Sequence, residues 1–204
     1  MKNQVSNART SFIPVFLQIV KENRKKVLSL DVRLKKFEME LTKISGEEHI
    51  HVVERKVLLL ETELAKASLI VIVFSAMVLE SYIYDYASRH LTDAFVRDHL
   101  DKLDTFSKWI IVPVLITGKE MSQQSNWREP LKKLIKTRNS IIHHKSAQLP
   151  TSFHDPNKYF EKLQGDSETL LEVAKQSSQL LDILAGKIIE IDPQESAWVK
   201  AYLT

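Results

Sequence analysis

The most apolar stretch of the chain is Ala67-Ser68-Leu69-Ile70-Val71-Ile72-Val73-Phe74-Ser75-Ala76-Met77-Val78-Leu79. It carries two serines and is shorter than the roughly 20 residues that span a bilayer, so it predicts a buried core helix and no membrane span. The surrounding region, from Glu47 to His90, has no Gly or Pro, and its apolar residues change from one stripe to nearly all sides after Ala67. We therefore expect one long helix whose second half enters the core.

The composition favours helices throughout. Among 204 residues, hydrophobic residues make up 44% and charged residues 27%, and only 4 Gly and 6 Pro are available for tight turns. No segment alternates with a period of two for long, and no internal repeat is present. The chain is long enough for one well-buried core and short for two. These features predict a single all-α domain with an extended N-terminal arm.

Cap residues and prolines mark the other helices. An amphipathic helix is expected from Pro14 to about Lys43, with Gly46 at its end. Helices then follow that are capped by Thr92, by Asp104 or Thr105, and by Ser167. A further helix is expected from Glu129 to about Ser146, and the segment from Gln148 to Asp166 reads as a loop with a turn near Phe160.

The helix expected from Glu129 carries Arg138-Asn139-Ser140-Ile141-Ile142-His143-His144. A guanidinium binds phosphate oxygens in a planar, bidentate manner, and the charge of an imidazole changes near neutral pH. Between Trp127 and Lys145 the chain has six basic side chains against the single acid Glu129. This local excess favours a polyanionic partner, and the RNA-binding side chains expected beside the motif are Lys132, Lys133, Lys136 and Lys145.

The motif suggests cleavage of RNA by attack of its own 2'-hydroxyl. In this hypothesis His143 moves the protons, Arg138 holds and neutralises the phosphate, and Asn139 orients the substrate or the imidazole. Asn139 and His143 share a helix face, whereas Arg138 and His143 diverge by roughly 140°, so the site needs a groove between helices or between two chains. The alternative is a surface arginine, a local cap and a histidine near a helix end.

Two further residues are candidates for catalytic support. His144 is a second choice for the proton carrier, although a solvated side chain is the commoner role for such a residue. Glu80 follows the apolar stretch and either orients His143 or Arg138, or is a surface carboxylate. We expect no metal site, because His49 and His51 are two residues apart and point in different directions on a helix. Tyr82, Tyr84 and Tyr86 are expected to pack rather than to stack on bases.

From about Ala65 to Leu184 the sequence resembles the HEPN superfamily of helical proteins. The resemblance rests on Arg138-Asn139 followed by His143 after four intervening residues, on the apolar helix that ends Ala76–Tyr86, and on Phe106–Trp109. It implies an up-and-down helical bundle, here residues 65–204. The resemblance does not cover residues 1–64, which we expect from their own pattern to form an amphipathic helical arm packed on the bundle. The resemblance also implies a homodimer in which two motifs face each other.

Many members of this superfamily are metal-independent endoribonucleases of toxin-antitoxin and defence systems, and others bind nucleotides or partner nucleotidyltransferases. The resemblance therefore implies an RNA-cleaving enzyme that needs no cofactor, with an antitoxin or a nucleotidyltransferase as a further partner. The alternative is a non-catalytic interaction or nucleotide-binding module. The absence of cysteine and a first apolar run that is interrupted by Pro14 and Gln18 favour a cytoplasmic protein.

Overall fold

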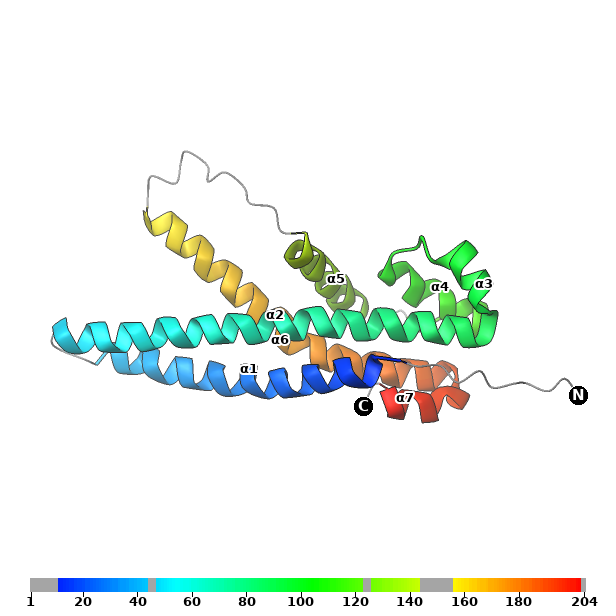
Figure 1. Cartoon of the computed structure of the whole chain (residues 1–204), viewed down its shortest axis with the longest axis horizontal. Coiled ribbons are helices and arrows are strands. Elements are labelled where there is room, and N and C mark those ends of the chain that lie inside the picture. The colour runs from blue at the N-terminus through cyan, green and yellow to red at the C-terminus, as the bar shows by residue number, and fades with distance from the viewer. Residues whose placement is uncertain (1–10, 44–46, 123–125, 144–155, 203–204) are drawn as a thin grey trace, which may run out of the picture.

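The structure is a computed structural model that describes residues 11–43, 47–122, 126–143 and 156–202, and these residues form helices and no strand (Figure 1). The all-α prediction is therefore confirmed for the described part of the chain. In chain order the elements are α1 (Ile13–Leu41), α2 (Glu47–Leu91), α3 (Asp93–Phe95), the π-helical turn η1 (Val96–Leu100), α4 (Thr105–Thr117), α5 (Arg128–Ile142), α6 (Pro156–Ile191), the 3₁₀ turn η3 (Pro193–Glu195) and α7 (Ser196–Tyr202).

Helices α1 and α2 lie side by side as a long hairpin (Figure 1). The apolar face of α1 joins the same core as α2 and α6 through Ile13, Leu17, Val20 and Val27. Asp31 of α1 also accepts a hydrogen bond from Lys175 of α6, with Nζ and Oδ2 2.7 Å apart. Within the described residues of the N-terminal arm, α1 thus packs on α2 and α6, and the position after residue 64 lies inside the continuous helix α2.

The apolar second half of α2 is the centre of the molecule. This helix contacts α1, α4, α5 and α6, and its residues Val71, Ile72, Val78, Leu79 and Ile83 are fully buried. Four neighbouring helices explain why apolar residues are needed on nearly every side of α2 in this region. The prediction of a buried core helix is confirmed. Among the described residues, no helix has the length and apolar character needed to cross a membrane.

Two predicted helix caps are confirmed. The Thr92 side chain accepts a hydrogen bond from the Phe95 N–H, 3.4 Å away, at the start of α3. Asp104 caps α4 in the same way, with Oδ1 3.0 Å from the Ser107 nitrogen. Each side chain satisfies one of the N–H groups that the first turn of a helix leaves without a partner.

The predictions for residues 148–166 and for Ser167 are wrong where the structure describes them. Helix α6 begins at Pro156 and continues to Ile191, so Gly165 and Ser167 lie inside it. Proline suits the first position of a helix, where its missing N–H costs nothing. An isolated glycine in a helix costs only about 1 kcal/mol relative to alanine, which is too little to end a helix of this length.

Candidate functional site

Helix α5 presents two chemically different faces. Leu131 and Leu134 are buried against the core, and Arg138, one turn further along, lies on the same side of the helix. Positions 132, 136, 139 and 143 are spaced by four, three and four residues, and their side chains are exposed. We call this set the basic face of α5; its residues are Lys132, Lys136, Asn139 and His143.

Arg138 reaches from α5 to α2. Its Nη2 atom lies 2.7 Å from Oε2 of Glu80, and 17% of the Arg138 side chain is exposed against 45% of the Glu80 side chain. The Arg138 Nε atom is buried without a hydrogen-bond partner in the described structure. The contact fixes the C-terminal half of α5 against α2. Glu80 is expected from the sequence to orient either Arg138 or His143, and in the structure it contacts Arg138.

His143 lies at the end of α5 rather than inside it. The helix ends at Ile142, earlier than the expected Ser146, and His143 has non-helical backbone angles (φ −99°, ψ 25°). Its N–H still donates to the Asn139 carbonyl oxygen at 2.9 Å. Within one chain, His143 is exposed while Arg138 faces α2. The structure thus brings Asn139 and His143 together by a backbone contact and leaves Arg138 on the other side of the helix.

The lysines expected to bind RNA differ in their surroundings. Lys132 pairs with Glu129 (Nζ to Oε1, 2.9 Å) and lies 5.1 Å from the centre of the Phe106 ring. Lys133 pairs with Glu172 of α6 at 3.0 Å, and Lys136 is exposed. These exposed pairs are weak and exchange readily for a phosphate. His144 and Lys145 lie outside the described residues.

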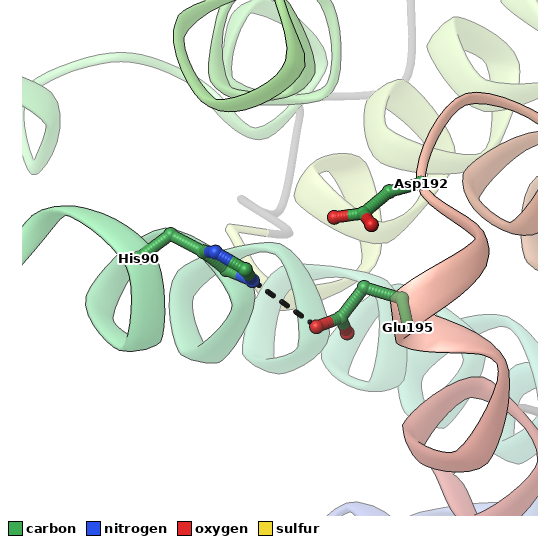
Figure 2. Close-up of side chains that lie close together, drawn as sticks. All are labelled: His90, Asp192 and Glu195. Carbon is green, nitrogen blue, oxygen red and sulfur yellow. Dashed lines mark hydrogen bonds and ion pairs between the residues drawn. The ribbon is translucent and has the colours of Figure 1, made fainter. Parts of the chain in front are cut away.

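A second cluster of polar side chains joins the end of α2 to the segment after α6. Figure 2 shows His90, Asp192 and Glu195 directed toward one another, and their ligand atoms all lie within 4.8 Å. His90 Nε2 is 3.1 Å from Glu195 Oε1, and the Tyr86 hydroxyl donates to Asp192 Oδ2 at 2.9 Å. Imidazole and carboxylate groups of this kind are ligands that Zn²⁺ accepts.

Arg89 already supplies a cation to this cluster. Its Nη1 and Nη2 atoms donate to the two oxygens of Glu195 at 2.6 and 2.8 Å, and its Nε donates to Asp85 at 2.9 Å. Glu195 is only 3% exposed. Burial raises the pKa of Glu195, but hydrogen bonds from Arg89 and His90 outweigh it and hold that pKa below its usual value. We call Arg89, His90, Asp192 and Glu195 the Glu195 network. We infer that its ion pairs hold η3 against α2.

The Glu195 network could not be predicted from the sequence. Glu195 lies 106 residues from Arg89 and 105 from His90 along the chain, so no local spacing could have indicated the pairing. Tyr82, Tyr84 and Tyr86 are predicted from the sequence to pack. Tyr82 and Tyr86 are buried, which confirms the prediction for these two, whereas Tyr84 is 37% exposed and the prediction is wrong there. Tyr82 stacks on Trp109 with ring centroids 5.9 Å apart.

Comparisons of this chain with protein-family models, with curated proteins and with solved structures give no match.

Proposed function

We propose that this protein is a HEPN-like endoribonuclease that cleaves RNA without a metal ion and acts as a homodimer, as a toxin or defence effector. The observation that carries the proposal is the basic face of α5. It aligns two lysines, an amide and an imidazole on one exposed side of a helix. Lysines bind the phosphate backbone of a nucleic acid, and an imidazole can transfer protons near neutral pH.

His143 is the proton carrier in this mechanism. His143 removes the proton of the RNA 2'-hydroxyl as the 2'-oxygen attacks the adjacent phosphorus. The imidazolium then returns this proton to the 5'-oxygen of the next nucleotide as the bond from phosphorus to that oxygen breaks. The products are a 2',3'-cyclic phosphate and a 5'-hydroxyl end. The exposed position of His143 at the end of α5 supports this role, because a bound strand can reach it. Asn139, one turn earlier, is placed to orient the substrate or the imidazole.

Arg138 stabilises the charge that develops on the phosphate. A guanidinium has five N–H donors. The Nε donor of Arg138 is buried and the Nη2 atom contacts Glu80, so the remaining Nη donors are the ones that bind phosphate oxygens in this proposal. Because Arg138 and His143 face different sides of α5, we propose that two α5 helices meet across a two-fold axis. Arg138 of one chain and His143 of the other then share one groove.

Mixing of inactive subunits tests this arrangement. Arg138→Ala and His143→Ala homodimers are each expected to be inactive on RNA in EDTA. When the two are unfolded, mixed and refolded, a shared site predicts that activity returns, because each mixed dimer contains one groove with both residues. The control is the Arg138→Ala/His143→Ala double variant mixed with either single variant, which contains no complete groove and is expected to stay inactive.

Lack of RNA cleavage by the folded, dimeric parent protein would contradict the proposed activity. Cleavage by the parent without recovery in the mixture would contradict the shared groove and leave the activity standing.

A second candidate function is that of an interaction module, and one observation favours it. The part of the α1–α2 hairpin away from α7 exposes large apolar side chains, with 68% of Val32, 63% of Leu58 and 60% of Leu59 accessible. Leu28, Val32 and Met39 share one side of α1 at spacings of four and seven. Exposed apolar side chains that share one side of a helix in this way are typical of contact surfaces. RNA that stays intact, together with an oligomer that Val32→Lys dissociates, would favour this function.

A further inference from the structure

The surface between α5 and α6 is hollowed beside the basic face of α5. Two adjoining cavities of about 640 and 590 Å³ lie there, and both are lined by Glu129, Pro130 and Gln176. Because they share these residues, we treat them as one feature, the α5–α6 groove. Lys132 and Lys136 line the groove and also belong to the basic face of α5. The groove is therefore continuous with the surface on which Asn139 and His143 lie.

The two walls of the groove differ in chemistry. The α5 wall supplies positive charge through Arg128, Lys132, Lys133 and Lys136. The α6 wall supplies the amides of Gln176 and Gln179, and the apolar side chains of Leu180 and Ile183 lie beside them. The acids at the groove are Glu129 and Glu172, which pair with Lys132 and Lys133, so the cations outnumber the acids by four to two. This charge is complementary to a polyanion.

Arg128, at the start of α5, packs over the ring of Trp127. Its guanidinium carbon lies 5.4 Å from the centre of the Trp127 ring, and Trp127 is fully buried. The Arg128 Nε atom is buried without a hydrogen-bond partner in the described part of the chain. A guanidinium that is fixed on an aromatic ring can stack on a nucleobase or bind a phosphate with its remaining donors.

We propose that the α5–α6 groove binds the single-stranded RNA that leads to His143. The phosphates follow the lysines of α5, and the bases turn toward α6, where Gln176 and Gln179 offer donors and acceptors to base edges. From Arg128 to His143 the helix rises about 22 Å at 1.5 Å per residue, which accommodates a short stretch of strand. An open groove with one cationic wall suits a polymer better than a small ligand, which proteins usually enclose.

This inference rests on the proposed function for the identity of the ligand as RNA, and binding tests it separately from cleavage. A fluorescent 12-nucleotide single-stranded RNA is titrated in EDTA into the His143→Ala protein, which leaves the probe intact, at several salt concentrations. Lys136→Ala in this background is expected to weaken binding several-fold. It is also expected to reduce the slope of log affinity against log salt by about 0.7, the value for one phosphate contact on a single strand.

Gln179→Leu tests the other wall. It keeps a similar side-chain volume and removes the amide, so affinity should fall and preference between RNA sequences should change while the salt slope stays the same. The matched control is Lys43→Ala, which removes an exposed lysine at the far end of the hairpin and should leave binding unchanged. Thermal melting of each variant verifies that it is folded.

Unchanged binding in both Lys136→Ala and Gln179→Leu would contradict RNA binding in the α5–α6 groove, even if the parent protein cleaves RNA. Equal affinity for a duplex of the same length would overturn the assignment to a single strand. If Lys136→Ala and Gln179→Leu weaken RNA binding but the parent protein leaves RNA intact, RNA binding in the groove is supported and the proposed cleavage is contradicted.

Discussion

Two arginine–glutamate pairs of this protein use the same chemistry in different surroundings. Arg89 holds Glu195 with two hydrogen bonds, and Glu195 is almost fully buried. Arg138 holds Glu80 with one hydrogen bond, and nearly half of the Glu80 side chain is exposed. A buried pair cannot lose one partner without leaving an uncompensated charge, whereas an exposed carboxylate is readily solvated. We infer that the first pair serves stability and that the second leaves Arg138 available to a substrate.

The largest expected effect is on stability, from Arg89→Ala. This variant leaves Glu195 buried without its bidentate partner, and the free energy of unfolding should fall by about 3–5 kcal/mol. Urea denaturation of the variant and the parent measures the difference. Lys187→Ala, which removes a partly exposed pair with Glu190 on α6, is the control and should change stability by less than about 1 kcal/mol. A similar small loss for Arg89→Ala would contradict the structural role of the network.

Acid should weaken the same network. The pKa of Glu195 is held below its usual value in the folded protein, so its charge contributes stability that is complete above the usual glutamate pKa of 4.5. This contribution is lost as the pH falls from that value through the lower pKa of the folded state. Unfolding free energies measured from pH 6 to pH 3 should therefore decrease toward low pH.

The Glu195→Gln variant is the reference for the pH experiment. Its stability should be lower at pH 6 and should fall less between pH 5 and pH 3, because the group that titrates is gone. Parallel curves for the two proteins would show that Glu195 does not carry the expected linkage.

Arg138→Ala should reduce RNA cleavage more than it reduces stability. The partner of Arg138, Glu80, is 45% exposed and stays solvated when Arg138 is removed, so the unfolding free energy is expected to fall by less than for Arg89→Ala, although packing of the Arg138 stem is lost. RNA cleavage, in contrast, should be lost, because the developing phosphate charge has no guanidinium beside it. Arg138→Lys keeps the charge but not the planar donors, and we expect it to restore only part of the activity. A stability loss as large as that of Arg89→Ala would place Arg138 with the structural pairs.

The long helices could be predicted from local sequence because their causes are local. The absence of Gly and Pro from Glu47 to His90 predicts α2, and the side chains of Thr92 and Asp104 mark the starts of α3 and α4. The start of α6 was missed because Pro156 reads equally as a loop residue and as the first residue of a helix.

The candidate site could be predicted only in part. The spacing of Asn139 and His143 indicates a shared side of α5, and their exposure agrees with it. The partner of Arg138 is 58 residues away in sequence, and the wall that α6 forms opposite α5 depends on how the two helices pack. Such contacts between distant segments are set by tertiary packing, which a local pattern does not encode.

The role of His143 as proton carrier is tested by analysing the RNA products that the parent protein and His143→Ala make in EDTA. We expect fragments that end in 2',3'-cyclic phosphate, formed at least about 100-fold more slowly by the variant because it lacks the group that transfers protons. The melting temperatures of the two proteins should agree, since His143 is exposed. Equal cleavage rates, fragments that end in a 3'-hydroxyl, or intact RNA with the parent protein would contradict this role of His143.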